Sequence, residues 1–161
     1  MAMLLLIILG LATFTGCERQ VPRTDYFPLR DGKGTLYIAD YGNDRVVVVT
    51  ENDGTFLGAC PVEKPEGVAV HPKTGALYVL SAPAHGGDRI LKFAGWKEPG
   101  RTAEFAAPIE GEKRDGATWV MALDASTDPP VVWLGGEKGS ILRLEDSGAA
   151  FESKIISRHQ Y

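Results

Sequence analysis

The sequence has few residues of the kinds that build metal centres and covalent cross-links. Its 161 residues include only two cysteines, Cys17 and Cys60, and three histidines. No Cys-x-x-Cys spacing occurs, so neither a zinc site nor a covalently attached haem has a ligand pattern here. A Cys17–Cys60 disulfide is one possibility. The alternative is that Cys60, which ends the apolar run 56–60, is a buried free thiol.

Clusters of basic residues are also absent. The formal net charge is −4, and Lys and Arg never form a block. Because proteins that bind nucleic acid present a basic surface, this composition argues against a nucleic-acid partner. The length suits one domain, and 19 glycines with 10 prolines predict many short elements joined by turns.

Charged side chains are missing from the first 16 residues, and residues 4–12 are all Leu, Ile, Ala or Gly. A bilayer-spanning helix needs about 20 apolar residues, so this shorter run fits the core of an export signal. It ends in Phe14-Thr15-Gly16-Cys17, which resembles the lipobox of bacterial lipoproteins. The resemblance implies a signal over 1–17, lipidation of Cys17, a tether over 18–24, and a membrane-anchored location in the bacterial cell envelope. An ordinary signal and an uncleaved anchor are the alternatives.

Apolar residues at helical spacing are lacking after the signal, so we expect essentially no helix there. The chain instead repeats one pattern, which is an apolar strand, a polar or glycine-rich turn and a second apolar strand. The expected strands are 26–29, 35–39, 45–50 and 56–61 in the first unit, 67–71, 76–80, 89–94 and 101–106 in the second, and 119–124, 131–134, 140–144 and 151–156 in the third.

The spacing of these units gives the period of the repeat. Leu36 and Leu77 are 41 residues apart, whereas Leu77 and Val132 are 55 apart, and we place the excess in polar loops at 96–102, 110–116 and 126–130. A period near 40 with four strands per unit is typical of β-propeller blades. We therefore predict an all-β fold, a partial β-propeller of about three four-stranded antiparallel blades over 25–161. The blades fall at about 25–62, 63–108 and 117–157, and residues 46–49 are expected to be buried on both faces.

Two stretches resemble a known repeat family. Leu36-Tyr37-Ile38-Ala39-Asp40 followed by Asn43-Asp44-Arg45-Val46-Val47-Val48 resembles the NHL repeat, and 65–72 followed by 75–79 is similar to the opening of the same repeat. The resemblance implies a propeller that closes with about six blades. Three blades would leave two apolar faces open. Either the chain is a fragment of a longer propeller, which is the interpretation we favour, or self-association of two chains completes a ring.

Glu66 is the candidate metal ligand, since it precedes a first strand of the kind that lines a propeller's channel. Gluconolactonase-like enzymes bind a divalent metal there through Glu, Asn and Asp, so the resemblance implies Glu66, with Asp115 and Asp25 as weaker candidates. Pro-Glu-Gly also opens many non-catalytic blades. No cofactor is therefore identified, although a divalent metal is possible. A fragment of a gluconolactonase-like hydrolase or an amide lyase-like enzyme is the alternative function.

The polar residues of the motif are interpreted as structural. We expect the Asp40 and Asp44 side chains to accept hydrogen bonds from backbone N–H groups in the turn, and Arg45 to pair with a carboxylate while stacking on Tyr37 or Tyr41. His71, just before a proline, is expected to cap its turn or to be exposed, and not to bind a metal. No serine has a histidine and an aspartate at a recognisable spacing, so no catalytic residue is predicted.

Trp96 and Arg101 are the predicted partner-binding residues. Both fall in the polar stretch 96–101, where we expect an exposed loop, and an exposed aromatic ring beside cations suits a partner contact. Trp119 and Trp133 are instead expected to pack between blades. The sequence is therefore interpreted as an envelope-anchored binding or scaffold module with a protein or glycan ligand on its rim loops, and a non-enzymatic role is favoured over an enzymatic one.

Overall fold

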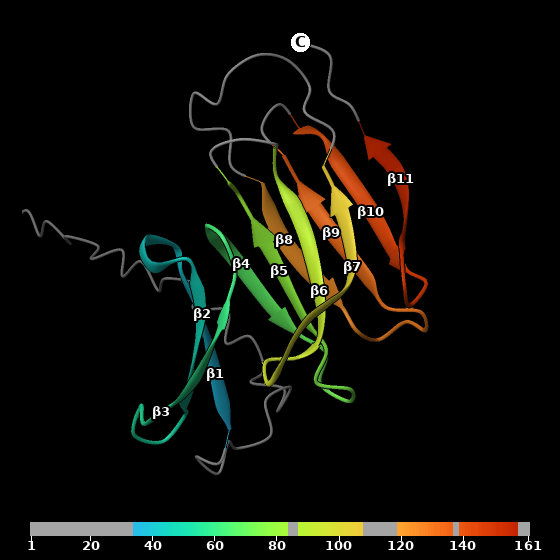
Figure 1. Ribbon diagram of the computed structural model, residues 1–161. Helices are drawn as coiled ribbons and strands as arrows, with labels where there is room; N and C mark the ends of the chain where they lie inside the picture. Colours follow the sequence, from blue (N-terminus) through green and yellow to red (C-terminus); the bar gives the residue numbers. More distant parts are fainter. Residues whose placement is uncertain (1–33, 84–86, 108–118, 137–138, 158–161) are drawn as a thin grey trace, which may run out of the picture. The chain divides into compact units, whose positions relative to one another are not determined.

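The computed structural model describes residues 34–83, 87–107, 119–136 and 139–157, all within one compact unit, Gly32–Tyr161. These residues form three separate β-sheets (Figure 1). Blade one has β1 (Thr35–Asp40), β2 (Arg45–Thr50) and β3 (Phe56–Pro61), with a short 3₁₀ turn, η1, at Tyr41–Asn43. Blade two has β4 (Pro65–Val70), β5 (Leu77–Ser81), β6 (Arg89–Gly95) and β7 (Glu98–Ala106). Blade three has β8 (Val120–Asp124), β9 (Val131–Gly135), β10 (Ile141–Asp146) and β11 (Phe151–Ser157).

Within each sheet, strands that are consecutive in the chain pair antiparallel, so each sheet is a meander such as β4-β5-β6-β7. No α-helix occurs in the part of the chain that the structure describes. The predicted fold class is therefore confirmed, because the chain folds as an all-β protein of successive blade-like sheets. The first strand expected in blade one, Tyr26–Leu29, lies outside the described residues.

The connection between β6 and β7 differs from the prediction. The polar stretch 96–102 was expected to be an inserted loop, but β7 begins at Glu98 and only Trp96 and Lys97 separate it from β6. β7 is the last strand of its sheet, and an outer strand accommodates charged side chains such as Arg101 and Glu104. The polar composition therefore reflects an edge strand and not a loop.

Two turns have the glycine geometry that the sequence indicates. Gly54, between β2 and β3, has φ of 71°, and Gly75, between β4 and β5, has φ of 75°. Residues with a Cβ are strained at such positive φ values, so glycine is the residue that allows each of these two turns. His71 stabilises the second turn as predicted, because its Nδ1 accepts the backbone N–H groups of Lys73 and Thr74 at 3.3 and 3.2 Å.

One hydrophobic core lies between blades one and two. Val46 and Cys60 of blade one pack with Leu77, Val79 and other apolar residues of blade two. Val46 and Val48 are fully buried, whereas Val47 and Val49 point to the other face of β2 and are only half-buried. The prediction that 46–49 is buried on both faces is therefore wrong for the second face, which no described sheet covers.

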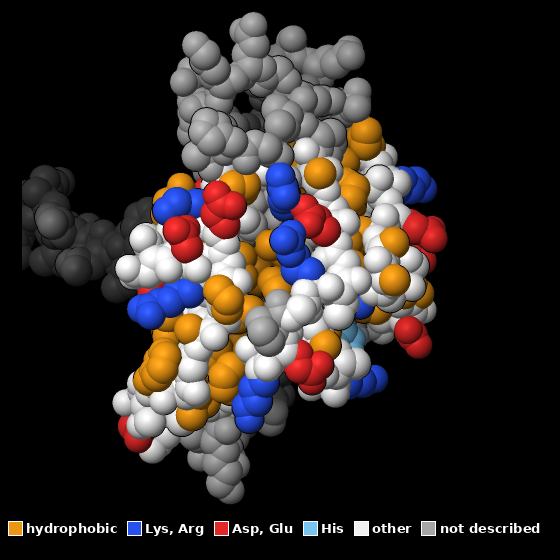
Figure 2. All heavy atoms as spheres, viewed as in Figure 1, with side chains coloured by type: hydrophobic (Ala, Val, Ile, Leu, Met, Phe, Trp, Pro, Cys, Tyr) orange, Lys and Arg blue, Asp and Glu red, His pale blue; other side chains and the backbone are white. Residues whose placement is uncertain are grey.

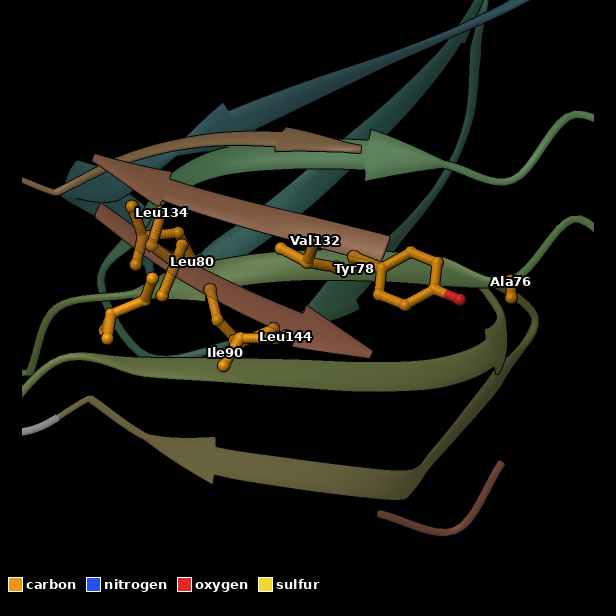
Figure 3. Packing of buried hydrophobic residues seen from close by; sticks show 8 residues of the cluster. Ala76, Tyr78, Leu80, Ile90, Val132, Leu134 and Leu144 are labelled. Atoms are coloured by element: carbon orange, nitrogen blue, oxygen red, sulfur yellow. The ribbon is translucent and has the colours of Figure 1, made fainter. Parts of the chain in front are cut away.

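A second core lies between blades two and three. Side chains from β5 and β6 meet side chains from β9 and β10, and they point toward one another in Figure 3; the buried members are Ala76, Tyr78, Leu80, Ile90, Val132, Leu134, Leu142 and Leu144. β5 contributes to both cores, and all five of its residues are buried. Blade two is thus held between two apolar layers.

Candidate functional site

A small pocket opens between blades one and two. Blade one lines it with Pro61, Val62 and Glu63, and blade two lines it with Ser81, Pro83, Arg89, Leu91, Phe93 and Arg101. Its volume is about 150 Å³, which is below the roughly 300 Å³ at which pockets for drug-sized ligands begin. The pocket therefore has room for one side chain or a similarly small group.

A carboxylate links the two arginines of this pocket. Arg89 Nη1 donates to Glu104 Oε1 at 3.0 Å, and Arg101 Nη1 donates to Glu104 Oε2 at 2.6 Å. Figure 2 shows basic and acidic side chains side by side over this region of blade two. Arg89 Nε is buried and has no hydrogen-bond partner in the described structure. Two guanidinium groups thus share one carboxylate at the pocket. Because each guanidinium has five N–H donors, this carboxylate cannot accept from all the donors of the two groups.

The two predicted partner-binding residues, Trp96 and Arg101, have different surroundings in the structure. The side chain of Arg101 is 54% exposed, so it is accessible to a partner. The ring of Trp96 was expected to be exposed, but it is half-buried and packs against the core between blades one and two. It lies so close to Gly58 that a Cβ there would be 2.6 Å from Trp96 Cζ3. The expectation is corrected because Trp96 is in a tight hairpin that folds back onto β3, and not in a loop.

Glu66 lies at an irregularity of the first strand of blade two. The pairing of β4 with β5 shifts register between Pro65 and Gly67, and the Glu66 side chain is exposed. Such a bulge re-aims one side chain relative to the strand. No group of three or more His, Cys, Asp or Glu side chains that could hold a metal forms within the described ranges. Asp25 and Asp115, the other candidates, lie outside those ranges.

The turn after β1 is held by the polar residues of the repeat motif. Arg45 Nε and Asn43 Nδ2 both donate to the Asp40 carboxylate, at 2.9 and 2.8 Å, and these hydrogen bonds lower the pKa of Asp40. Asp44 Oδ1 accepts the backbone N–H of Lys64 at 3.0 Å, which ties the turn to the start of blade two and lowers the pKa of Asp44. Asp40, Asp44 and Arg45 thus have structural contacts, and Arg45 pairs with a carboxylate as expected. Asp40 is held chiefly by side chains, however, and the backbone N–H that Asp44 accepts lies 20 residues further on, outside the turn.

The aromatic contact in this turn involves a different cation from the one expected. Lys64 Nζ lies 5.1 Å from the ring centroid of Tyr41, whereas Arg45 was expected to stack on a tyrosine. Arg45 is instead held by Asp40. Lys64 also forms an ion pair with Asp44 at 3.2 Å, so the turn and the linker between the blades are joined by two weak surface contacts.

A buried polar network joins blades two and three, and sequence reasoning missed it. Tyr78 Oη donates to Asp146 Oδ2 at 2.6 Å, and Lys92 Nζ lies 2.8 Å from the same oxygen. Asp146 Oδ1 accepts the backbone N–H of Gly148 at 2.9 Å. Burial, with a further contribution from Asp146, raises the pKa of Tyr78. The network is fully paired and its ion pair is nearly inaccessible, so its geometry is that of a structural clasp.

Of the two cysteines, Cys60 lies within the described residues and Cys17 does not. Cys60 is fully buried with a free thiol, as one of the two alternatives predicts, and burial raises the pKa of that thiol. A thiol in such surroundings is a poor nucleophile. Cys17, the predicted lipidation site, lies outside the described residues. Helices long and apolar enough to cross a membrane do not occur in the described segments.

The pocket, the turn after β1 and the buried network between blades two and three are the polar sites described above for residues 34–83, 87–107, 119–136 and 139–157. Neither a protein-family model nor a curated protein matches the sequence.

Proposed function

We propose that this protein is a non-enzymatic binding module, exported and anchored in the bacterial cell envelope through a lipid on Cys17. The pocket between blades one and two carries the proposal. Apolar side chains such as Leu91 and Phe93 line it together with two arginines, Arg89 and Arg101. That combination suits the small acidic side chain of a protein partner.

The size of the pocket favours a protein over a glycan. A volume of about 150 Å³ admits a single side chain but does not enclose a sugar ring with its hydration. Arginine recognises carboxylates through paired N–H donors, and Arg101 could exchange its contact with Glu104 for one with an incoming carboxylate. The partner on the blade rim is therefore proposed to be a protein segment that presents Asp or Glu.

The pocket can be tested on the full chain in detergent by titrating short peptides that carry one Glu, each with a Gln counterpart. We expect the Glu peptides to bind, and Arg101→Ala to weaken binding about tenfold, as for loss of one charged contact. Lys73→Ala removes an exposed cation from the turn between β4 and β5 and should leave binding unchanged. Equal binding of Glu and Gln peptides, or binding of oligosaccharides alone, would refute the acidic-partner proposal.

The anchor requires a separate experiment. Cells that express the full chain are fed labelled palmitate, and the chain is recovered from the membrane fraction. We expect label on the wild-type chain and none on Cys17→Ser, with the variant no longer cleaved at that position. Label that persists in Cys17→Ser, or an unlabelled wild-type chain, would contradict the lipid anchor while leaving the pocket proposal intact.

A further inference from the structure

Two sheet faces are incompletely covered among the described residues, one on blade one and one on blade three. On blade one, Leu36 is 38% exposed, Ile38 48% and Phe56 62%. On blade three, Ile141 is 39% exposed and Val120 67%. Hydrophobic side chains gather over the strands of blade one in Figure 2. Apolar sheet faces of this kind usually mark an interaction surface.

Strand register shows which faces correspond in the three blades. One face, here named the trailing face, carries an aromatic ring opposite a residue of the next strand; these pairs are Tyr37 with Val48, Tyr78 with Lys92, and Trp133 with Arg143. The opposite face, here named the leading face, carries aliphatic pairs; these are Ile38 with Val47, Val79 with Leu91, and Leu134 with Leu142. The exposed face of blade one is its leading face, and that of blade three is its trailing face.

The chain already contains two junctions between such faces. The trailing face of blade one, with Tyr37, packs on the leading face of blade two, with Val79. The trailing face of blade two, with Tyr78, packs on the leading face of blade three, with Leu134. The two uncovered faces are therefore the two halves of a third junction of the same kind, in which Trp133 would meet Ile38.

Charge follows the same correspondence. In the junction between blades two and three, Lys92 on the trailing face pairs with Asp146 on the leading side at 2.8 Å. By strand register the residue equivalent to Lys92 on blade three is Arg143. Counting along the equivalent strand from Val47, which corresponds to Leu142, the residue of blade one equivalent to Asp146 is Glu51. A cation and a carboxylate thus stand at matching places on the two uncovered faces.

We propose that a second copy of this chain covers both faces, with the trailing face of blade three in each copy packed on the leading face of blade one in the other. Head-to-tail contacts of this kind give a closed ring when the rotation between copies closes. Two copies of the three described sheets make a ring of six, within the roughly four to eight blades that propellers have. Three copies would exceed that range, so the ring is a dimer.

A charge swap tests this arrangement on the full chain in detergent, with mass measured by light scattering or native mass spectrometry across a dilution series. We expect a dimer for the wild-type chain. Arg143→Glu and Glu51→Arg should each weaken the dimer about tenfold or more, since each puts like charges together in a junction. The double variant should recover the wild-type affinity because the pair is restored in reverse. Lys73→Glu changes net charge by the same amount, away from both faces, and should not alter the dimer.

Recovery in the double variant separates a lost junction from a damaged fold, and far-ultraviolet circular dichroism checks the fold of each variant. A monomeric wild-type chain would overturn the proposal, because something other than a second copy would then cover the two faces. Open-ended chains of copies would overturn the closed ring. Folded single variants that dimerise like the wild-type chain, or a double variant that does not recover, would refute the Arg143–Glu51 junction.

Discussion

Asp53 lies in the turn between β2 and β3, where it accepts hydrogen bonds from the Thr50 hydroxyl and from the backbone N–H of Thr55. These bonds lower the pKa of Asp53 from 3.8 to about 2. A carboxylate whose pKa is depressed by folding stabilises the native state above its unfolded pKa, and this contribution is lost as the pH falls through the folded pKa. Asp40, Asp44 and Asp124 shift in the same direction.

We therefore predict that stability falls as the pH is lowered from about 4 to about 2, and that Asp53→Asn makes this fall less steep. Urea denaturation of the wild-type chain and the variant at a series of acidic pH values measures the slope. Thr50→Val removes the principal donor and should reduce the slope in the same way. Identical slopes in all three proteins would show that the turn does not hold the Asp53 carboxylate in solution.

Local pairs of residues were predictable from the sequence. Asp40 and Arg45, or His71 and the backbone N–H of Thr74, are at most five residues apart, so turn chemistry alone indicates their contacts. Tyr78 and Asp146 are 68 residues apart. Their contact depends on how two sheets pack, and no local pattern in the chain encodes it.

At the scale of single elements, the hairpin between β6 and β7 is fixed by its contact with β3. The Trp96 ring covers Gly58, and a Cβ at that position would be 2.6 Å from Trp96 Cζ3. The ring is packed against the core between blades one and two, so moving it away from Gly58 would lose packing contacts there. The glycine is needed here for the close approach of a ring to a strand.

We predict that Gly58→Ala lowers the free energy of unfolding by about 1–3 kcal/mol, as overpacking does elsewhere, and the positive φ of 157° at this position adds backbone strain to that cost. Gly100→Ala adds the same methyl group in β7 where nothing lies within 4 Å, and should have a much smaller effect. Thermal or urea denaturation measures both. In a Trp96→Ala background the cost of Gly58→Ala should shrink, and an unchanged cost there would mean that the ring is not its cause.

Strand positions were predictable because they depend on local residue type, whereas the roles of Trp96 and 96–102 were not. Alternation of apolar residues and glycine turns indicates where strands such as β2 and β9 begin and end. The same polar composition suits a loop or an outer strand. The pairing of β7 with β6, at Arg101 with Phe93 and at Glu98 with Gly95, distinguishes the two, and that pairing is a property of the sheet.

For the whole molecule, the clasp of Tyr78, Lys92 and Asp146 is the polar link between blades two and three. The side chain of Asp146 is only 3% exposed and that of Lys92 only 14% exposed. Removing one partner of a buried ion pair leaves the other charge without compensation, which typically costs about 3–5 kcal/mol.

Asp146→Ala should therefore lower the free energy of unfolding by about 3–5 kcal/mol, whereas Tyr78→Phe should lower it by about 1–2 kcal/mol. Glu145→Ala, at the neighbouring and more accessible position, provides the control and should change stability little. Replacing both charges, by Lys92→Met with Asp146→Leu, should be less harmful than Asp146→Ala alone. If the double variant were the less stable of the two, the ion pair would itself stabilise the fold, and the cost of Asp146→Ala would not come only from leaving Lys92 buried without a partner.

The position of β5 between two cores has a consequence for how the molecule opens. Within a single chain, local fluctuations can release β1 or β11 at the expense of contacts on one side only, because each belongs to a blade with a face that no described sheet of the same chain covers. β5 is paired with β4 and β6 on its two edges and packed by an apolar core on each face, so its amides reach solvent only when this sheet and both layers come apart. Hydrogen exchange at β5 should therefore report the free energy of complete unfolding, the upper limit among the amides of the described sheets.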